Sequence, residues 1–299
     1  MKKIEKKYNL IIGRHCSVKK PEFLSGAVKE TVGYGANALM FFLGSPRNSY
    51  RRTLEDSEII KFKNSLKENN INIDNVVVHS SYLLNLANTV KEETFIRSVN
   101  ALKKELVIMK KIGLKTIVLH PGSSIFDSLT EKSLLKLVEG LNLTLKTNSD
   151  IRIALETMSG RRGEIGKNFE QLKFILDRIK KKKKVGICWD TCHLFAYGYD
   201  IKNNFEKVLK EFKEKIGLKK LWVIHINDSV FDIGERKDRH ENIGYGKIGF
   251  VALKKIVFYP EFNGLIKLLE TPRKRNIWKE EINQLKTSKA PYPVDDSTR

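Results

Sequence analysis

Six successive apolar runs of this sequence each end in a residue of a type that binds metal ions. The six end residues are His79, His120, Glu156, Asp190, His225 and Glu270. The chain has six histidines in all, and two others, His193 and His240, stand close to Asp190 and Asp238. One such histidine is usually an ordinary hydrogen-bonded residue. Imidazoles and carboxylates in these numbers, without paired thiolates, favour zinc, or manganese as the harder alternative.

The candidate ligands are too numerous for one ion. The full set is His79, His120, Glu156, Asp190, His193, His225, Asp238, His240 and Glu270. A zinc ion takes about four ligands, so this set predicts two or three ions. Divalent ions clustered about 3.5–4 Å apart are the usual means of activating water and holding a leaving oxygen in phosphoryl transfer. The ligand count therefore favours a phosphate ester as the substrate.

The charge of the chain favours the same substrate class. Lys and Arg number 56 against 35 Asp and Glu among 299 residues, a formal net charge of +21. A positive field of this size attracts polyanions, because phosphates gain Coulomb energy and release counterions on binding. A Lys-rich genome explains a basic composition equally well. The charge therefore supports a nucleic-acid partner only in combination with the ligands.

A closed barrel would bring these ligands together. Eight apolar runs of strand length alternate with longer amphipathic segments such as Glu92–Ile112, Phe169–Lys180 and Phe205–Ile216, a pattern typical of parallel strands buried on both faces. Eight such units predict an α/β fold, a single (β/α)8 TIM barrel with the metal cluster where the C-terminal ends of the strands meet. A doubly wound open sheet is the competing architecture. The predicted strands are Leu10–Arg14, Ala38–Leu43, Asn75–His79, Thr116–His120, Ile151–Glu156, Val185–Asp190, Leu221–His225 and Leu265–Glu270.

The rest of the composition predicts one catalytic domain in a reducing compartment. No Pro-, Gly- and Ser-rich linker divides residues 1–287, whereas residues 288–299 read as a disordered tail or as one foreign to the native protein. The three cysteines form no CxxC pair, and their odd number argues against a disulfide framework. No apolar stretch approaches the roughly 20 residues of a membrane helix. We expect a cytoplasmic protein with no membrane partner.

Several motifs invite other interpretations. The segment Gly244–Gly249 matches G-x-G-x-x-G but follows a polar loop, and no acidic ribose partner follows it, so we expect a tight turn and no nucleotide cofactor. The run Lys180–Lys184 precedes a strand and is predicted to be a solvated loop opposite the barrel mouth. Cys188 and Cys192 lie beside a predicted ligand; a thiolate ligand is one interpretation and a small buried residue the favoured one. His15, after the first run, is placed outside the ligand set, as a polar residue near it.

Eight short segments carry a resemblance to a known family. They are Val78–Leu86, Leu119–Ser123, Ala154–Thr157, Trp189–His193, Gly198–Asp200, His225–Ser229, Lys237–Gly244 and Leu269–Pro272. Together and in this order they resemble the motifs of the endonuclease IV family of apurinic/apyrimidinic endonucleases, and the resemblance extends from about Ile11 to Leu285. Arg14 departs from the family, which commonly has a small residue there. The departure concerns the local packing near the mouth and not the ligand set.

The resemblance implies a trinuclear zinc site, with Mn²⁺ as an alternative at one position. It implies that His79, His120 and Glu156 hold one ion, that Glu156 bridges to a second ion shared with Asp190, His225 and Glu270, and that His193, Asp238 and His240 hold the third. The implied reaction is hydrolysis of the phosphodiester bond 5′ to an abasic site in duplex DNA, which leaves a 3′-hydroxyl and a 5′-deoxyribose phosphate, with trimming of blocked 3′ ends. Glu156 would orient the attacking water and accept its proton.

The resemblance also implies how DNA is bound. By motif position, Tyr82 and Leu83 would wedge into the duplex beside a flipped abasic nucleotide, and Arg47 would enter the duplex or bind a phosphate. The enzyme is expected to act as a monomer associated with the nucleoid. The alternative is a metal-dependent sugar isomerase or epimerase of the xylose-isomerase-like barrel type, which needs only one or two ions and a small polar pocket. The third ligand group and the basic charge argue against it.

Overall fold

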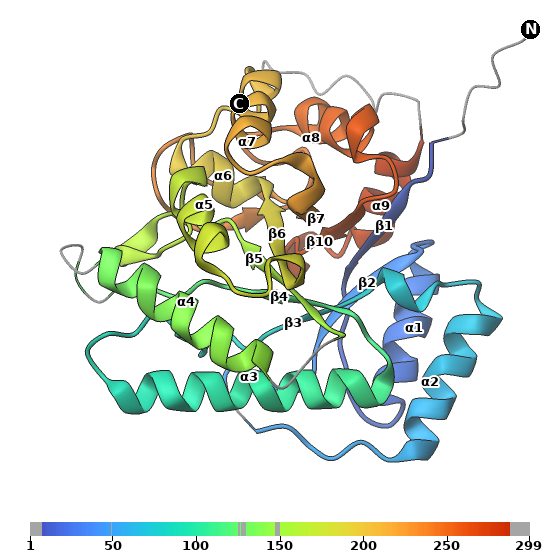
Figure 1. Cartoon of the computed structure of the whole chain (residues 1–299). Helices are drawn as coiled ribbons and strands as arrows, with labels where there is room; N and C mark the ends of the chain where they lie inside the picture. Colours follow the sequence, from blue (N-terminus) through green and yellow to red (C-terminus); the bar gives the residue numbers. More distant parts are fainter. Residues whose placement is uncertain (1–7, 49, 125, 127–129, 147–149, 288–299) are drawn as a thin grey trace, which may run out of the picture.

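Eight parallel strands form a closed barrel at the centre of the molecule, with the helices outside it (Figure 1). The computed structural model describes residues 8–48, 50–124, 126, 130–146 and 150–287. The strands are hydrogen-bonded in the order β1-β10-β7-β6-β5-β4-β3-β2, which confirms the predicted barrel and excludes the open sheet. They are β1 Ile11–His15, β2 Ala38–Phe42, β3 Val76–His79, β4 Thr116–Leu119, β5 Arg152–Glu156, β6 Val185–Asp190, β7 Leu221–His225 and β10 Ile266–Leu269.

Most predicted strands agree with the observed ones to within one residue at each end, the usual uncertainty of such boundaries. β1 begins and ends one residue later than predicted, so His15 is its last residue rather than the residue after it. β4 and β10 end at Leu119 and Leu269, so His120 and Glu270 lie one residue beyond their strands. The tail predicted for residues 288–299 lies outside the described residues.

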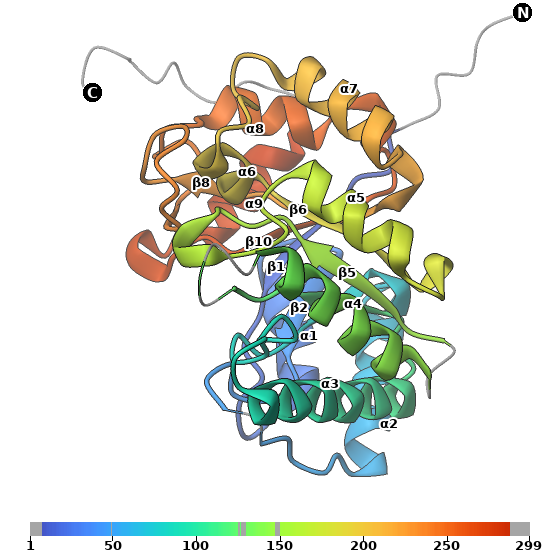
Figure 2. The same cartoon turned by 60° about the vertical axis from the view of Figure 1, so that its left-hand side comes forward.

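The helices follow the strands along the chain and pack side by side around the barrel (Figure 2). The helix predicted at Glu92–Ile112 has these bounds, and it ends because Gly113 adopts a left-handed conformation, φ 92°. The helices predicted at Phe169–Lys180 and Phe205–Ile216 end slightly earlier. The α-helices are α1 Phe23–Gly33, α2 Asp56–Glu68, α3 Glu92–Ile112, α4 Thr130–Lys146, α5 Phe169–Arg178, α6 Thr191–Tyr197, α7 Phe205–Lys215, α8 Phe250–Val257 and α9 Trp278–Lys286.

Two smaller features complete the described chain. The loop after β7 contains a short antiparallel pair, β8 Asp228–Ser229 and β9 His240–Glu241. The run of lysines ends in a 3₁₀ turn, Lys182–Lys184, just before β6. Lys180–Lys183 are exposed there, at the N-terminal end of the strand, which confirms the solvated loop. Among the described residues, no helix has the length and apolar character needed to cross a membrane.

The interior of the barrel explains why the candidate ligands converge. Side chains inside the strands form a small core of Ala38, Met40, Val77, Val118, Ala154, Cys188, Val223, Ile266 and Leu268. Successive side chains of a strand point to opposite faces, so the residue two positions after an interior residue also points inward. The six strand-end candidates follow Val77, Val118, Ala154, Cys188, Val223 and Leu268 by two positions. Each candidate therefore continues an interior column at the C-terminal mouth.

Candidate metal centre

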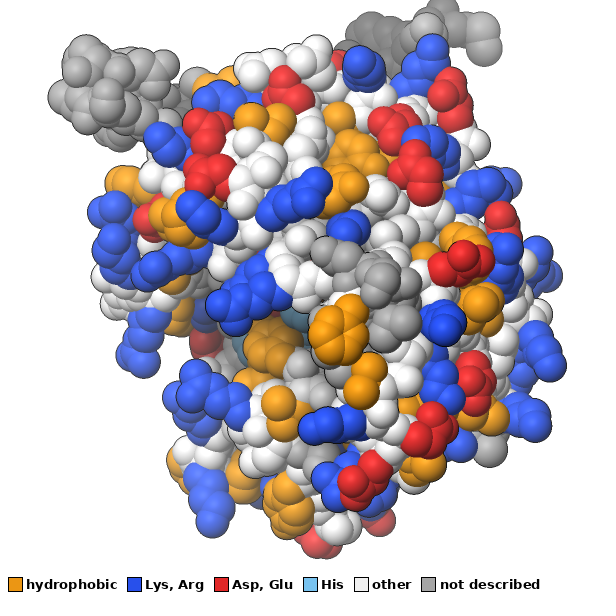
Figure 3. Space-filling model, turned by 90° about the vertical axis from the view of Figure 1, so that its left-hand side faces the viewer, with side chains coloured by type: hydrophobic (Ala, Val, Ile, Leu, Met, Phe, Trp, Pro, Cys, Tyr) orange, Lys and Arg blue, Asp and Glu red, His pale blue; other side chains and the backbone are white. Residues whose placement is uncertain are grey.

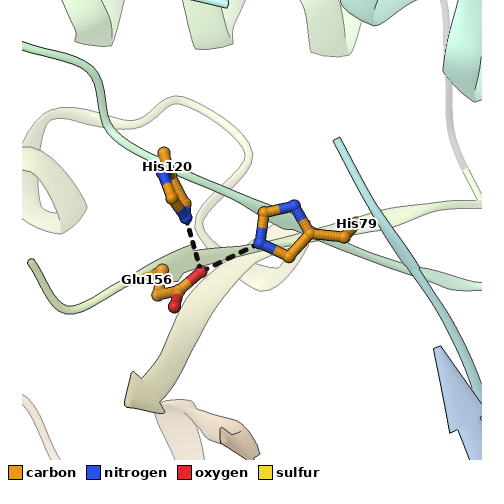
Figure 4. A group of neighbouring side chains, drawn as sticks. All are labelled: His79, His120 and Glu156. Atoms are coloured by element: carbon orange, nitrogen blue, oxygen red, sulfur yellow. Dashed lines mark hydrogen bonds and ion pairs between the residues drawn. The ribbon is translucent and has the colours of Figure 1, made fainter. Parts of the chain in front are cut away.

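Glu156, at the end of β5, lies at the centre of the site and is fully buried. Its Oε2 atom lies 3.1 Å from His79 Nε2 and 3.1 Å from His120 Nε2 (Figure 4). Its Oε1 atom lies 3.1 Å from His225 Nδ1 and 3.4 Å from His193 Nδ1. One carboxylate therefore faces four imidazoles from four different parts of the barrel mouth.

A second group surrounds His225, at the end of β7. Its Nδ1 atom lies 3.1 Å from Glu156, 3.2 Å from Glu270 and 3.7 Å from Asp190, measured to carboxylate oxygens. A single N–H proton cannot satisfy three carboxylates at once. A divalent cation can, because it binds several oxygens and a neutral imidazole nitrogen together. The arrangement therefore fits a cation better than a hydrogen-bonded network.

A third group forms where the loop after β7 returns to the mouth. Asp238 Oδ1 lies 3.2 Å from His193 Nε2 and 3.6 Å from His240 Nε2. His240 Nε2 is also 3.6 Å from Asp190 Oδ2, so Asp190 adjoins this group as well as the second. Cys192, which is buried, also lies within 4.8 Å of Asp238 and His240, measured between potential ligand atoms. All nine sequence-predicted ligands thus lie together at the mouth.

Two residues that the sequence analysis did not identify hold the ligands in place. Asn227 Nδ2 donates to Asp190 Oδ2 at 2.7 Å, and the backbone N–H of Glu270 donates to Asn227 Oδ1 at 2.8 Å. The hydroxyl of Thr157 accepts from the N–H of Asp190 at 2.9 Å, and its carbonyl lies 2.9 Å from His193 Nδ1. The available signal was position: Thr157 and Asn227 are polar residues one or two places after a predicted ligand.

The buried Asp228 carboxylate organises the loop that carries Asp238 and His240. It accepts backbone N–H bonds from Gly244 and Gly246 at 3.0 Å and from Ile248 at 2.9 Å, with Gly249 at 3.3 Å. A Cβ atom on Gly246 would lie 2.4 Å from Asp228 Oδ1, so only glycine fits this close approach. The G-x-G-x-x-G segment is therefore the predicted tight turn, built around a carboxylate of the same chain.

A second buried carboxylate ties this loop to the last helix. Glu281, on α9, accepts from Asn242 Nδ2 at 2.9 Å, from the N–H of Ile243 at 2.8 Å and from the hydroxyl of Thr271 at 2.8 Å. Thr271 directly follows Glu270. The third ligand group and the end of β10 are thereby held to one helix.

The electrostatics of the site favour charge pairs. Burial alone would lower the pKa of His193, but Asp190 and Asp238 outweigh it and raise that pKa well above its ordinary value. Burial would likewise raise the pKa of Glu156, yet the imidazoles of His225 and His120 hold it well below its usual range. A divalent cation can replace the protons that these pairs share. By contrast, burial lowers the pKa of His15 to about 4, which leaves it a neutral imidazole.

Unpartnered nitrogens test whether the donor set fits metal ions. Among the described residues, His225 Nε2 is buried without a hydrogen-bond partner, and the buried Nε2 atoms of His193 and His240 form no hydrogen bond but face carboxylate oxygens at 3.2–3.6 Å. A buried polar atom left in this way is costly unless another group binds it. The imidazole and carboxylate donors, grouped around three shared positions, suit zinc. The residues present therefore fit a cluster of divalent cations.

The three candidate DNA-binding residues lie at the rim of the same mouth. The Tyr82 ring packs 5.3 Å from the His79 ring and 5.2 Å from the His120 ring, and half of the residue is exposed. Leu83 and Arg47 are exposed beside it. Ser81 Oγ donates to the Pro46 carbonyl at 2.9 Å and so joins the two loops. Figure 3 shows this face as a hollow with histidine side chains at its base and Lys and Arg side chains around it.

Two further expectations have clear structural outcomes. Cys188 and Cys192 are both buried, as the favoured interpretation predicted. Arg14, the departure from the family motif, is also buried; its guanidinium pairs with Glu30 at 2.8 Å and lies 3.5 Å from the centre of the Trp278 ring. The larger side chain is thus accommodated on the outer side of the barrel, away from the ligands.

A parallel barrel with clustered His, Asp and Glu at its C-terminal mouth defines a class of metal-binding TIM barrels. Residues 28–288 match the family model described as the xylose isomerase-like TIM barrel. The chain is 42% identical over 282 residues to "Probable endonuclease 4" of Oceanobacillus iheyensis, with 92% of this chain and 94% of that protein covered. The corresponding protein of Staphylococcus carnosus is 41% identical, with 93% and 95% covered. The chain belongs to the endonuclease IV family within this class of barrels.

Solved structures agree with this assignment. The crystal structure of endonuclease IV from Thermus thermophilus matches with a TM-score of 0.81 and 29% identity, covering 92% of this chain and 97% of that one. Sugar epimerases also match, with TM-scores up to 0.65 and identities no higher than 19%. Likeness at that identity shows the shared fold alone.

Proposed function

We propose that the protein is a DNA-repair endonuclease that hydrolyses the phosphodiester bond 5′ to abasic sites in duplex DNA. The products would be a 3′-hydroxyl and a 5′-deoxyribose phosphate, and the same site would trim blocked 3′ ends. The observation that carries the proposal is the His225 nitrogen surrounded by three carboxylates, next to two further ligand groups that share Glu156 and Asp190. The names of the relatives support the DNA substrate.

The nine candidate ligands would hold three zinc ions, with Mn²⁺ as an alternative at one position. His79, His120 and Glu156 form one group, and Glu156, Asp190, His225 and Glu270 form the next. His193, Asp238 and His240 form the third, with Asp190 adjoining it. When bound, zinc ions lower the pKa of water toward neutrality and stabilise negative charge on a phosphate.

Within this site, Glu156 would orient the attacking water and accept its proton. Its two oxygens face imidazoles on both sides, which keeps the carboxylate ionised and fixes its position. Asn227 and Thr157 would keep Asp190 and His193 in position during the reaction. Asn227 is hydrogen-bonded to Asp190 and the Thr157 carbonyl to His193, and neither residue belongs to the ligand set. The strand ends would thus hold the reacting carboxylate and the candidate ligands in fixed positions.

Tyr82, Leu83 and Arg47 would recognise the lesion. Tyr82 and Leu83 are exposed, and the Tyr82 ring packs against His79 and His120, so the two side chains would fill the space that a missing base leaves in the stack. An abasic nucleotide has no base to unpair, which lowers the cost of flipping it toward the site. Arg47, on the loop joined to theirs through Ser81, would enter the duplex or bind a phosphate.

The decisive experiment joins a metal count to a cutting assay. We expect about three zinc ions per chain by elemental analysis, and a nick 5′ to a single tetrahydrofuran abasic analogue that leaves a 3′ end extendable by a DNA polymerase. The same duplex without the lesion is the control substrate. Intact abasic DNA with full metal loading would contradict the proposal, and one ion per chain would favour the sugar isomerase or epimerase.

A further inference from the structure

Arg162 adopts a backbone conformation that a residue with a side chain rarely takes. It lies in the 3₁₀ turn Arg161–Gly163 after β5, with φ 44° and ψ 52°. Gly160 and Gly163 beside it also have positive φ, 78° and 76°. Glycine would adopt this left-handed conformation without strain, whereas arginine is disfavoured there. Backbone stability therefore does not explain an arginine at this position.

Arg236 has the same property on a neighbouring loop. Its φ is 54°, and it stands two residues before the candidate ligand Asp238. Its backbone N–H donates to the Ala196 carbonyl at 2.8 Å, and its guanidinium lies 5.7 Å from the centre of the Tyr197 ring. Two arginines in left-handed conformations therefore lie on loops that directly adjoin the metal centre.

Tyr197, at the end of α6, joins the two loops. A Cβ atom on Gly160 would lie 2.9 Å from Tyr197 Cδ2 and 3.3 Å from Lys167 Cδ, so the turn after β5 rests against this ring. The Tyr197 hydroxyl accepts from Asn168 Nδ2 at 3.1 Å. The Tyr197 ring therefore contacts the β5 loop and also lies near Arg236.

Four cations on and beside these two loops are not neutralised by the described part of the chain, whereas Lys237 pairs with Glu235 at 2.8 Å. We call Arg161, Arg162, Lys167 and Arg236 the Tyr197 cluster. None of the four forms an ion pair with a described residue, and three of them are exposed. The acid of the loop, Glu164, instead accepts from Ser159 Oγ at 2.9 Å and from the backbone N–H of Arg161 at 3.0 Å. The cluster therefore presents net positive charge to solvent.

We propose that the Tyr197 cluster binds backbone phosphates of the DNA strand beside the scissile bond. The inference rests on the proposed function and deepens it. Gly160 lies four residues after Glu156, and Arg236 lies two residues before Asp238. The cluster therefore borders the candidate metal centre without belonging to it. Arginine matches phosphate oxygens with two parallel N–H bonds, and unpaired guanidiniums beside a phosphodiester site favour this ligand. Such contacts position the duplex without reading its sequence.

Arg162→Gly tests the proposal because it removes the cation and relieves the backbone. The zinc-loaded variant should melt no lower than the wild type. Its affinity for an undamaged duplex should fall roughly three- to ten-fold at about 0.1 M salt, and the slope of log affinity against log salt should decrease by about one. The KM for a duplex with one abasic analogue should rise by a similar factor. Arg236→Gly should act in the same way, independently.

Two matched controls separate charge, position and backbone. Asn70→Gly, after α2, relieves another positive φ, 55°, without loss of charge, and Lys183→Ala removes one exposed charge at the opposite end of the barrel. Neither should change DNA affinity. An unchanged salt slope and KM in both arginine variants, or an equal loss in Lys183→Ala, would overturn the inference while wild-type cutting of abasic DNA stands. A wild type that leaves abasic DNA intact would instead refute the proposed function.

Discussion

At the level of single residues, Glu156 has the most demanding environment in the site. It is fully buried, faces four imidazoles and belongs to two ligand groups. An amide in its place would keep the size but lose the charge and one acceptor oxygen. Glu156→Gln therefore changes the chemistry of the site with little change in packing volume.

We expect Glu156→Gln to reduce cutting of abasic DNA by at least about 100-fold, because the amide cannot accept a proton and lacks the charge that two candidate ligand groups share. Affinity for undamaged duplex DNA should stay within about three-fold of wild type, since the surface cations are untouched. Nicking assays and fluorescence anisotropy measure the two quantities. Glu241→Gln, next to His240 but outside the described ligand groups, is the matched control. Wild-type activity in Glu156→Gln would remove Glu156 from the mechanism.

At the level of elements, the barrel strands and the β7–α8 loop place ligands by different means. Six candidates stand at or just beyond strand ends, where backbone pairing with both neighbours holds them. Asp238 and His240 instead depend on the long loop between β7 and α8, which is held by the Asp228 turn and by Glu281. The third ligand group is therefore the one that should respond to changes outside the ligand set.

Replacing Asp228 with Asn should loosen this loop. The amide nitrogen would face backbone N–H donors, so two or more of the hydrogen bonds around Asp228 would be lost, at a local cost of about 1–3 kcal/mol. We expect zinc content to fall from about three toward two ions per chain, with faster amide hydrogen exchange at residues 240–249. Asp232→Asn, an exposed acid of the same loop, should change neither. Full zinc content with unchanged exchange would show that the turn does not position the third group.

For the molecule as a whole, a buried lysine couples folding to pH. Lys267, on β10, is fully buried between the barrel and its outer layer. Its Nζ donates to the carbonyls of Phe262 at 2.7 Å and Leu265 at 3.0 Å. Burial lowers its pKa to about 7. Between that value and the ordinary lysine pKa of about 10.4, the unfolded chain binds a proton that the folded chain does not.

As pH rises through this window, the contribution of Lys267 should increase the free energy of unfolding by up to about 1.4 kcal/mol per pH unit. Below about pH 7 both states are protonated and the contribution is flat. Denaturant melts of wild type and Lys267→Met between pH 6 and about 10 should differ most steeply above pH 7. Lys210→Met, at an exposed position on α7, is the control. Parallel pH profiles for wild type and Lys267→Met would contradict this account.

Much of the fold could be predicted because burial leaves a local pattern. The strands of a parallel barrel are apolar on both faces, so runs such as Val185–Asp190 are visible without any knowledge of their partners. Helix α3 was found with its observed bounds because its apolar spacing is regular and Gly113 ends it. The candidate ligands could also be recognised from the sequence. Packing does not require His, Asp or Glu at the end of an apolar run, so six successive ends of these types indicate a shared chemical role.

Residue order and residue type were thus sufficient for the barrel and for the nine candidate ligands. They could not give the contacts between them, because these join positions tens of residues apart whose distances are set by closure of β1 on β10. That His225 Nδ1 faces three carboxylates, that Asp190 adjoins the third group and that Asp228 fills the glycine turn follow from loop conformation and barrel geometry. Short-range sequence patterns contain no information on loop conformation or barrel closure. The electrostatics of the site could therefore be derived only from the tertiary structure.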